Sequence, residues 1–324
     1  MKKEPVSVLG CGRWGSFHAW HADHIGCDAL LWGRPGSKRL ARLTEDRKNE
    51  YLTLPKSVRL SDSLAEALEQ AETVIISVGV QGFRALCKHI AVLPPSLWRK
   101  KTFVLCMKGL EQDSGKRLSQ VFREELGDAP ATAVWVGPGH VQDFIAGIPN
   151  CMLLASDEKK LPPRLARLLE SPLIRFYYGS DLLGVEIGAA AKNVVGLAAG
   201  MLDGLGLASL KGALMARGAA ELSRLVSAMG GDPMTVYGLS HLGDYEATLF
   251  SPYSNNRRFG ENLIRGLPSE KLAEGVYTAD ALALLGKKYG AELPITDAIR
   301  SVIRDGANPK DVLLRLFLRE QKSE

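Results

Sequence analysis

A glycine motif near the amino terminus, Gly10-Cys-Gly-Arg-Trp-Gly15, limits the possible folds more than any other segment. It directly follows the apolar run Val6–Leu9, and a helical pattern begins immediately after it. In such a unit the first glycine permits a tight turn, the second lets backbone approach a pyrophosphate, and the third lets helix pack on strand. N–H groups at the helix N-terminus then suit the anion. A chance glycine-rich turn would explain the motif alone, but the flanking strand and helix favour dinucleotide binding.

Short runs of strand-like composition alternate with helical patterns through the first half of the chain. The predicted strands are Val6–Leu9, Ala29–Trp32, Thr73–Val78, Thr102–Cys106, Ala133–Val136, Cys151–Ala155 and Ile174–Tyr178. Helical spacing occupies Ser61–Gln70, Gly82–Ile90 and Lys116–Leu126. Strands joined by helices predict right-handed crossovers and a Rossmann-like, doubly wound, mostly parallel sheet with helices on both faces.

The strand signal ends near Asp181, and only helical patterns follow. We predict helices at Gly184–Gly204, Leu210–Met229, Arg257–Gly266, Val276–Tyr289, Pro294–Asp305 and Asp311–Arg319. A chain of 324 residues is long enough for two domains. We therefore expect a dinucleotide-binding Rossmann domain at 1–182 and an all-α substrate-binding domain at 183–324.

Composition excludes several classes of protein. The 41 Lys and Arg residues exceed the 36 Asp and Glu residues by only five, which is too weak an excess to indicate nucleic-acid binding but suits a small anionic ligand. The five cysteines show no CxxC spacing, so we expect neither disulfides nor a zinc site, and a reducing cytoplasm. The apolar stretch Val185–Leu202 contains Glu186, Lys192 and Asn193, which predicts a buried helix rather than a membrane span.

The residues after the second predicted strand bear on the choice between NAD and NADP. A carboxylate that grips the ribose 2′-hydroxyl is expected there for NAD. The chain instead has Arg34, Lys38 and Arg39, which would hold a 2′-phosphate. A solvated basic loop is the alternative, and we favour NADP, with NAD left open.

Two lysines are candidates for chemistry. Lys192 lies among alanines and glycines on a predicted helix, and burial would lower its pKa toward the range useful for proton transfer. A surface lysine is the alternative. Lys108 follows the strand Thr102–Cys106 at its carboxyl end, where open α/β sheets bind ligands.

Other polar segments allow both a functional and a structural interpretation. Gly137-Pro-Gly-His140 could offer backbone N–H groups to a substrate or be an ordinary turn. Gly243-Asp244 and Ser251–Arg258 suit a phosphate ester, although a capped surface loop fits equally well. His18, His21 and His24 share a helix without completing a metal-ligand spacing, so we predict packing or surface histidines and no metal.

Taken together, these segments resemble the bacterial type of NAD(P)-dependent glycerol-3-phosphate dehydrogenase, from Val8 to about Asp280. The matching segments are Gly10–Gly15, Ser77–Gln81, Lys108–Glu111, Gly137–Val141, Ala189–Val195, Gly238–Asp244, Ser254–Gly260 and Ala273–Gly275. The resemblance implies interconversion of dihydroxyacetone phosphate and sn-glycerol 3-phosphate, which supplies the phospholipid backbone.

The resemblance also implies roles for individual residues. Lys192 is implied to protonate the carbonyl oxygen, Asp244 to orient its amine, and Lys108 to contact the substrate. Further implied substrate contacts are Gly137, Gly139, Asn193, Thr248, Ser254, Asn255, Asn256 and Arg257. Implied cofactor contacts are Gly10, Gly12, Arg13, Trp14, Gly15, Arg34, Lys108, Val141, Asn255, Leu272 and Glu274.

The chain departs from the family pattern at Asn255, where an arginine usually touches phosphate and cofactor. Losing that contact would cost about 1.5–3 kcal/mol of binding unless Arg257 or Arg258 substitutes. Gly139 stands where serine is common, and Gly79 where proline is usual.

Two other functions are considered: a dehydrogenase of the same plan acting on a hydroxy acid or sugar phosphate, and a catalytically silent NADP-binding sensor. The polar segment Ser254–Arg258 with Asp244 argues against the first, and the retained Lys192, Lys108 and Asp244 argue against the second. We expect a small-molecule substrate, no nucleic-acid partner and no membrane insertion, with a homodimer through the helical half left open.

Overall fold

The structure, a computed structural model, describes residues 3–269 and 273–318. The chain divides into two compact units. The first contains the residues up to Met107 together with Leu118–Leu182, and the second contains Lys108–Arg117 together with the residues from Leu183 onward. The segment Lys108–Arg117 therefore packs with the helical unit, although strands of the sheet precede and follow it in the chain.

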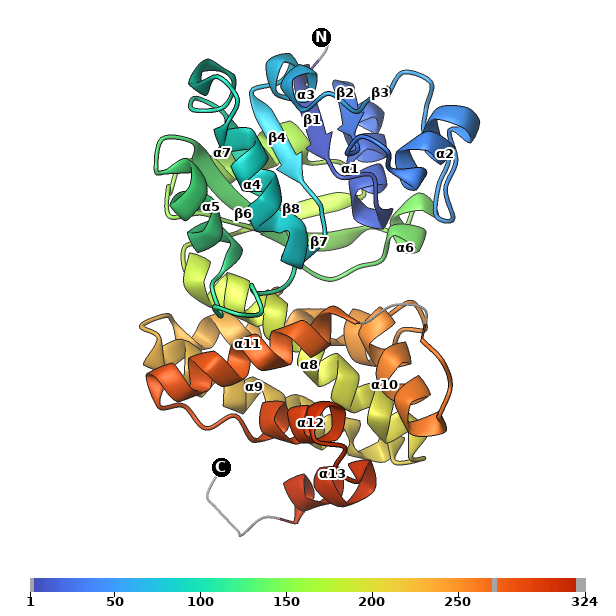
Figure 1. The fold of residues 1–324 in the computed structure, drawn as a ribbon, viewed down its shortest axis with the longest axis vertical. Helices are drawn as coiled ribbons and strands as arrows, with labels where there is room; N and C mark the ends of the chain where they lie inside the picture. The colour runs from blue at the N-terminus through green and yellow to red at the C-terminus, as the bar shows by residue number, and fades with distance from the viewer. Residues whose placement is uncertain (1–2, 270–272, 319–324) are drawn as a thin grey trace. The chain divides into compact units, whose positions relative to one another are not determined.

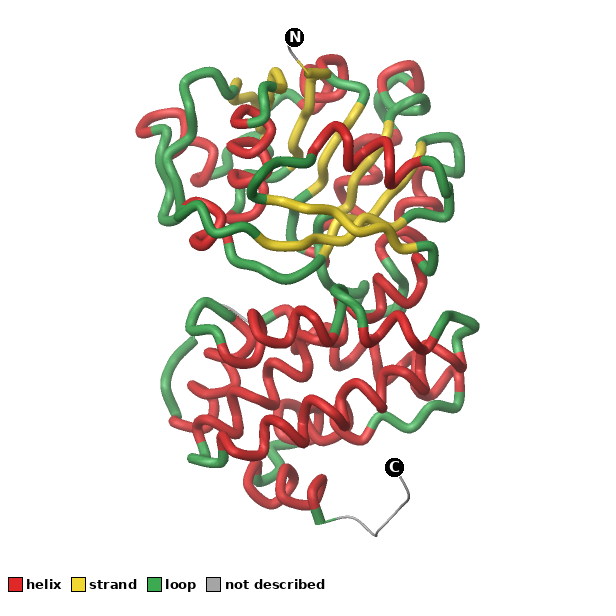
Figure 2. The backbone as a smooth tube through the Cα atoms, turned by 180° about the vertical axis from the view of Figure 1, so that it is seen from behind, coloured by secondary structure: helices red, strands yellow, loops and turns green. Residues whose placement is uncertain are grey.

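An eight-stranded sheet forms the first unit (Figure 2, strands in yellow). The strands are β1 (Lys3–Leu9), β2 (Cys27–Trp32), β3 (Arg59–Ser61), β4 (Thr73–Ile76), β5 (Thr102–Leu105), β6 (Ala131–Val136), β7 (Asn150–Ala155) and β8 (Ile174–Gly179). Their order is β3-β2-β1-β4-β5-β6-β7-β8, and all neighbours are parallel except β6 and β7. The predicted mostly parallel, doubly wound sheet is confirmed.

Helices cover both faces of this sheet. They are α1 (Arg13–His24), α2 (Lys38–Asp46), α3 (Leu64–Gln70), α4 (Phe83–Ala91), α5 (Leu118–Leu126), α6 (Val141–Ile145) and α7 (Leu161–Leu169). On one face Val104 joins a core cluster with Phe17 of α1 and Phe144 of α6. On the other face the ring of Phe103 packs 5.0 Å from that of Phe122 in α5. Because neighbouring residues of β5 are buried on opposite faces, the strand is apolar throughout.

One strand and three α-helices of this unit have no counterpart in the sequence prediction. The strand β3 is only three residues long and has no apolar run. The helix α6 has five residues, and α2 has a largely charged sequence in which only Leu40 and Leu43 are buried. The helix α7 begins Leu-Pro-Pro, and two consecutive prolines are typical of a loop. Proline is nevertheless well accommodated in the first turn of a helix.

The second unit is helical, as predicted (Figure 1). Its helices are α8 (Leu182–Gly204), α9 (Lys211–Ala228), α10 (Asn255–Arg265), α11 (Glu274–Tyr289), α12 (Pro294–Arg304) and α13 (Pro309–Phe317). Short turns connect them: η3 (Ala208–Leu210), η4 (Pro233–Tyr237), η5 (Leu242–Asp244) and the π-helical η6 (Glu246–Phe250). The predicted end of the last helix at Arg319 lies outside the described residues.

The core of the second unit is built around α8. This helix is long and apolar enough to cross a membrane, but 94% of its most apolar window is buried inside the protein, as in the central helix of a globular core. A Cβ on Gly200 would stand 1.9 Å from the carbonyl oxygen of Arg257 in α10. A Cβ on Gly260 would stand 2.2 Å from the carbonyl oxygen of Leu197. The two helices therefore touch backbone to backbone, and this contact fixes the position of α10 against α8.

Candidate active site

The turn between β1 and α1 has the geometry that a dinucleotide pyrophosphate requires. Gly10 has φ +116°, and a Cβ there would stand 2.2 Å from the carbonyl oxygen of Ser77. A Cβ on Gly15 would stand 1.6 Å from the carbonyl oxygen of Gly10. At Gly12, by contrast, the nearest atom to a Cβ would be a guanidinium nitrogen of Arg39, 3.5 Å away. Packing thus explains Gly10 and Gly15, whereas Gly12 keeps space beside the first turn of α1, where N–H groups suit an anion.

The strand order places this turn at the ligand-binding edge of the sheet. β1 lies between β2 and β4, so the connections run in opposite directions on its two sides. Ligands of open α/β sheets bind outside the carboxyl ends of the strands at such a point. The residues present therefore fit a nicotinamide dinucleotide.

The basic loop after β2 borders the same turn. The side chains of Arg34, Lys38 and Arg39 are exposed, and Arg39 reaches the Gly12 position as described above. Ser37 accepts a hydrogen bond from the Leu40 N–H at 3.4 Å and so fixes the start of α2. These cations suit a phosphate on the ribose, as the sequence predicts for NADP.

Two lysines and one aspartate meet inside the second unit. Oδ2 of Asp244 lies 2.7 Å from Nζ of Lys108 and 2.9 Å from Nζ of Lys192. The side chain of Asp244 is 1% exposed and that of Lys192 is 8% exposed. Lys192 also donates a hydrogen bond to Oγ1 of Thr248 at 2.6 Å. The structure thus brings together four residues that sequence reasoning singled out, from α8, η5, η6 and the segment after β5.

Burial lowers the pKa of Lys192 to about 8, while the carboxylate of Asp244 acts in the opposite direction and the ammonium of Lys108 lowers it further. The amine is therefore mostly protonated at neutral pH but releases its proton readily. A group of this kind is a good general acid toward an oxygen that becomes negative during a reaction. The surface-lysine alternative for Lys192 is wrong.

A chain of amides lies next to the lysines. Asn193 donates a hydrogen bond to the carbonyl oxygen of Lys108 at 2.8 Å, and Asn256 donates one to Oδ1 of Asn193 at 2.9 Å. The Gly275 N–H, beside Glu274 in the first turn of α11, donates to Oδ1 of Asn256 at 2.9 Å. Asn193 and Asn256 thus join α8, α10 and α11 around the lysine cluster. Leu272 lies outside the described residues.

The arginines of α10 differ in their environments. Ser254 caps the helix by accepting from the Arg257 N–H at 3.3 Å. The guanidinium of Arg257 lies 2.6 Å from the Asp203 carboxylate and 3.4 Å from that of Glu261. Arg258 is exposed and donates a hydrogen bond to Oδ1 of Asn255 at 2.8 Å. The guanidinium of Arg258 therefore lies at Asn255, whereas that of Arg257 is held by two carboxylates.

The Gly137–Val141 turn belongs to the first unit. Gly137 and Gly139 have φ +135° and +121°, conformations that residues with side chains rarely adopt. The side chain of Val141 is buried in the core at the start of α6, which leaves its backbone as the group that can meet a ligand.

Two histidines of helix α1, His18 and His21, pack in an aromatic core, whereas His24 is exposed. His18 lies 4.5 Å from the ring of Trp135, His21 lies 5.9 Å from that of Phe17, and burial lowers the pKa of both histidines to about 3. His24 stacks on Trp20. Within residues 3–269 and 273–318, no group of three or more His, Cys, Asp or Glu side chains has the arrangement of a metal site.

Sequence reasoning missed two buried groups of the second unit. His241 is 0% exposed and lies next to the lysine cluster. Asp203 holds Lys211 at 2.7 Å as well as Arg257. Charged residues so far apart in the chain give no local signal of pairing. His241 lies in Gly238–Asp244, one of the segments that carry the family resemblance, and this match was the available signal.

A sheet with a dinucleotide-binding turn, together with a buried lysine paired with a carboxylate, is typical of an NAD(P)-dependent oxidoreductase. The models of the NAD-dependent glycerol-3-phosphate dehydrogenase N-terminus and C-terminus match residues 5–161 and 181–314. The chain belongs to this family.

Curated relatives extend over the whole chain. Glycerol-3-phosphate dehydrogenase [NAD(P)+] of Streptomyces coelicolor is 34% identical, covering 100% of this chain and 99% of the relative. The protein of that name from Thermus thermophilus is 37% identical, covering 98% and 99%. The crystal structure of glycerol-3-phosphate dehydrogenase from Coxiella burnetii has a TM-score of 0.90 and 28% identity, covering 98% of this chain and 99% of that one.

Proposed function

We propose that this protein interconverts dihydroxyacetone phosphate and sn-glycerol 3-phosphate with NAD(P)H and supplies glycerophospholipid synthesis. The observation that carries the proposal is the Asp244 carboxylate between the ammonium groups of Lys192 and Lys108. Family membership indicates the substrate, and the lysine cluster supplies the chemistry that reduction of a ketone needs.

The reaction adds a hydride and a proton across a carbonyl group. A nicotinamide cofactor held at the Gly10–Gly15 turn would supply the hydride. Lys192 gives its proton to the carbonyl oxygen as negative charge develops there, and in the reverse direction it takes the hydroxyl proton. Lys108 stabilises the same oxygen electrostatically, and Asp244 keeps both ammonium groups in place. The net charge of these three groups, +1, also favours an anionic substrate.

We assign the remaining substrate contacts to the residues around this cluster. Thr248 contacts the amine of Lys192, and Asn193 contacts the backbone of Lys108. These contacts support roles for both residues beside the reacting carbon. Arg258 supplies the charge for the phosphate in place of an arginine at Asn255, because its guanidinium already lies at that residue. Other substrate contacts are assigned to Gly137, Gly139, Ser254, Asn256 and Arg257.

The cofactor contacts are assigned to the glycine turn and the basic loop. Gly12 leaves room for the pyrophosphate, and Arg34 with Arg39 favours NADP over NAD. Further assigned contacts are Gly10, Arg13, Trp14, Gly15, Lys108, Val141, Asn255, Leu272 and Glu274. We assign dinucleotide binding to the predicted domain 1–182 and substrate binding to the predicted domain 183–324, with Lys108–Arg117 packed in the second compact unit. A cytoplasmic location and a homodimer stay predictions, the latter open to sedimentation analysis.

The test is a substrate panel with the purified protein. Dihydroxyacetone phosphate, two hydroxy-acid precursors and two sugar phosphates are each incubated with NADPH or NADH, and oxidation is followed by the loss of nicotinamide absorbance. We expect the highest kcat/KM with dihydroxyacetone phosphate and NADPH. A higher value with another substrate would refute the substrate assignment, and a clear preference for NADH would refute the NADP assignment.

A further inference from the structure

The imidazole of His241 is buried beside the lysine cluster and has partners at both nitrogens. Nδ1 lies 2.9 Å from the carbonyl oxygen of Gly188, and Nε2 lies 2.6 Å from the hydroxyl of Tyr245. A carbonyl oxygen accepts only, so Nδ1 carries the proton, and the Tyr245 hydroxyl donates to Nε2. Both bonds are satisfied by one neutral tautomer.

The Gly188 contact ties His241 to the helix that presents Lys192. Gly188 lies one turn before Lys192, so its carbonyl oxygen also accepts from the Lys192 backbone N–H within α8. A Cβ on Gly188 would stand 3.0 Å from Oγ of Ser240 and 3.2 Å from Cβ of His241. The segment that bears His241 therefore lies directly against α8.

The backbone of His241 in turn fixes Asp244. The N–H of Asp244 donates to the carbonyl oxygen of His241 at 3.0 Å, within the short turn η5. His241 thus binds α8 through its ring and the Asp244 turn through its carbonyl group. These two connections join α8 to the turn that carries Asp244. The ion pair of Lys192 and Asp244 joins the same two segments.

Tyr245 supports the ring from the other side. Tyr245 is 0% exposed, and the two ring centroids lie 4.7 Å apart in an edge arrangement. A Cβ on Gly218 would stand 2.8 Å from the Tyr245 hydroxyl, so glycine in α9 is what makes space for this oxygen. The hydroxyl is therefore held in one position relative to Nε2.

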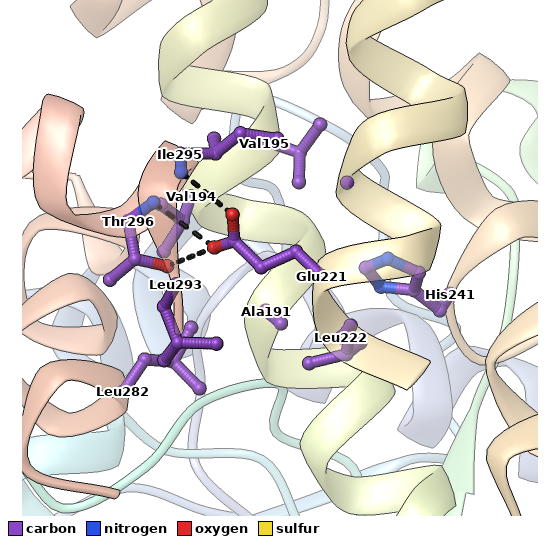
Figure 3. A pocket seen from close by; sticks show the side chains of 11 residues that line it. Ala191, Val194, Val195, Glu221, Leu222, His241, Leu282, Leu293, Ile295 and Thr296 are labelled. Carbon is purple, nitrogen blue, oxygen red and sulfur yellow. Dashed lines mark hydrogen bonds between the residues drawn. The ribbon is translucent and has the colours of Figure 1, made fainter. Parts of the chain in front are cut away.

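A small cavity of about 10 Å³ adjoins the ring, near the lower limit for one water molecule (Figure 3). Glu221 of α9 borders the cavity, and its carboxylate accepts hydrogen bonds from the N–H groups of Ile295 and Thr296 at the start of α12. In Figure 3 this carboxylate points toward α12, and the His241 ring lies on the other side of the Glu221 side chain.

From these contacts we infer that His241 is a positioning residue for the proposed reaction, holding the Asp244 carboxylate against Lys192 through Gly188 and Tyr245. The expected effect of His241 on the reaction rests on the proposed function, whereas its effect on the pKa of Lys192 does not. The titratable groups around the ring are Lys192 on α8, Asp244 and Tyr245 on its own segment, and Glu221 on α9.

The protonation state agrees with this role. Burial lowers the pKa of His241 to about 4, with the Gly188 hydrogen bond and Asp244 opposing and Lys192 lowering it further. Burial also raises the pKa of Tyr245. The imidazole and the phenol are therefore both neutral throughout the working pH range. The ring holds its partners in place and neither gains nor loses a proton.

Three variants test the inference. His241→Leu removes both ring contacts, His241→Asn keeps a donor at the Nδ1 position, and Tyr245→Phe removes only the hydroxyl. We expect kcat of His241→Leu to fall between about tenfold and a hundredfold, because small misplacements of catalytic groups have effects of this size. KM should change less than kcat. Because Asp244 then supports Lys192 less well, activity in ketone reduction should be lost at lower pH than in the wild type.

The order of the variants in kcat and in its pH dependence distinguishes a positioning role of His241 from a purely structural role. The kcat of His241→Asn should be closer to that of the wild type than the kcat of His241→Leu. In the pH profile of kcat, the basic limb is the range in which activity is lost as the pH rises. Tyr245→Phe should shift this basic limb to lower pH, as His241→Leu does. Leu225→Ala, which removes a fully buried side chain from α9, is the control: it should lower Tm without moving the basic limb. If His241→Leu does not fold, the pH profile of Tyr245→Phe tests the inference by itself.

A second measurement is independent of turnover. In protein with isotope-labelled lysine, the side-chain signal of Lys192, identified by its loss in Lys192→Met, gives the pKa by NMR titration. A lower pKa in His241→Leu or Tyr245→Phe supports the inference even if the wild type does not reduce dihydroxyacetone phosphate. An unchanged pKa together with an unchanged pH profile would overturn it, whatever the substrate.

Discussion

Asp244→Asn removes the negative charge between the two lysines with almost no change in shape. At an effective dielectric of about 20, a charge pair at the observed 2.9 Å interacts by about 6 kcal/mol. Desolvation offsets part of this, and breaking a buried pair by removing one partner has a net cost of about 3–5 kcal/mol. The remaining ammonium of Lys108 further disfavours a charge on Lys192.

The consequence for activity follows from the protonation of Lys192. Its pKa is about 8, so at about pH 7 some 90% of the amine is protonated. If about 3 kcal/mol of stabilisation is lost, the pKa falls to about 6 and the protonated fraction at about pH 7 falls to roughly 10%. We therefore expect kcat for ketone reduction to fall about tenfold at that pH from protonation alone and to recover toward about pH 5.5.

The assay is the pH profile of kcat for dihydroxyacetone phosphate reduction at saturating NADPH, measured for wild type and variant. Asp203→Asn is a matched control, since Asp203 is also a carboxylate between two cations, Lys211 and Arg257, and its side chain is only 11% exposed. It should destabilise the protein without moving the basic limb. A profile of Asp244→Asn that superposes on that of the wild type would refute the electrostatic reasoning.

Three further predictions use the same purified protein. Lys192→Ala should lower kcat more than about a hundredfold while circular dichroism and Tm show a folded protein, because the general acid is lost; an active variant would end the assignment. Gly12→Ala should fold normally yet bind NADPH more weakly in a fluorescence titration, whereas Gly15→Ala should not fold, since its Cβ would stand 1.6 Å from a carbonyl oxygen. Arg39→Ala should raise KM for NADPH and leave KM for NADH nearly unchanged; an equal effect on both would argue against a 2′-phosphate contact.

The sheet was predictable because its signals are local. The central strands β4 and β5 are buried on both faces, so each is a continuous apolar run that the sequence displays. The glycine motif was equally informative, because Gly10 and Gly15 are dictated by backbone contacts within a single turn. The strand β3 and the helices α2, α6 and α7 were missed because they are short or depend on neighbours for their stability.

The site was predictable in part. Lys192 was recognisable as buried because no other charged residue lies between Glu186 and Asp203, and family resemblance supplied Asp244 and Thr248. The partners of Arg257 could not be predicted, since Asp203 lies more than fifty residues away and the pair forms only when α8 and α10 pack at Gly200 and Gly260.

The amino-acid sequence alone determined the alternation of the longer strands and helices, the turn that suits a pyrophosphate, and the types of residue available for proton transfer. These properties depend on steric limits and burial patterns within short segments. Only the tertiary structure decided which carboxylate meets which ammonium, that His241 joins α8 to the turn of Asp244, and that burial lowers the pKa of Lys192 to about 8. Such electrostatic properties depend on distances between segments remote in the chain and on exclusion of water, and both arise only when the helices pack.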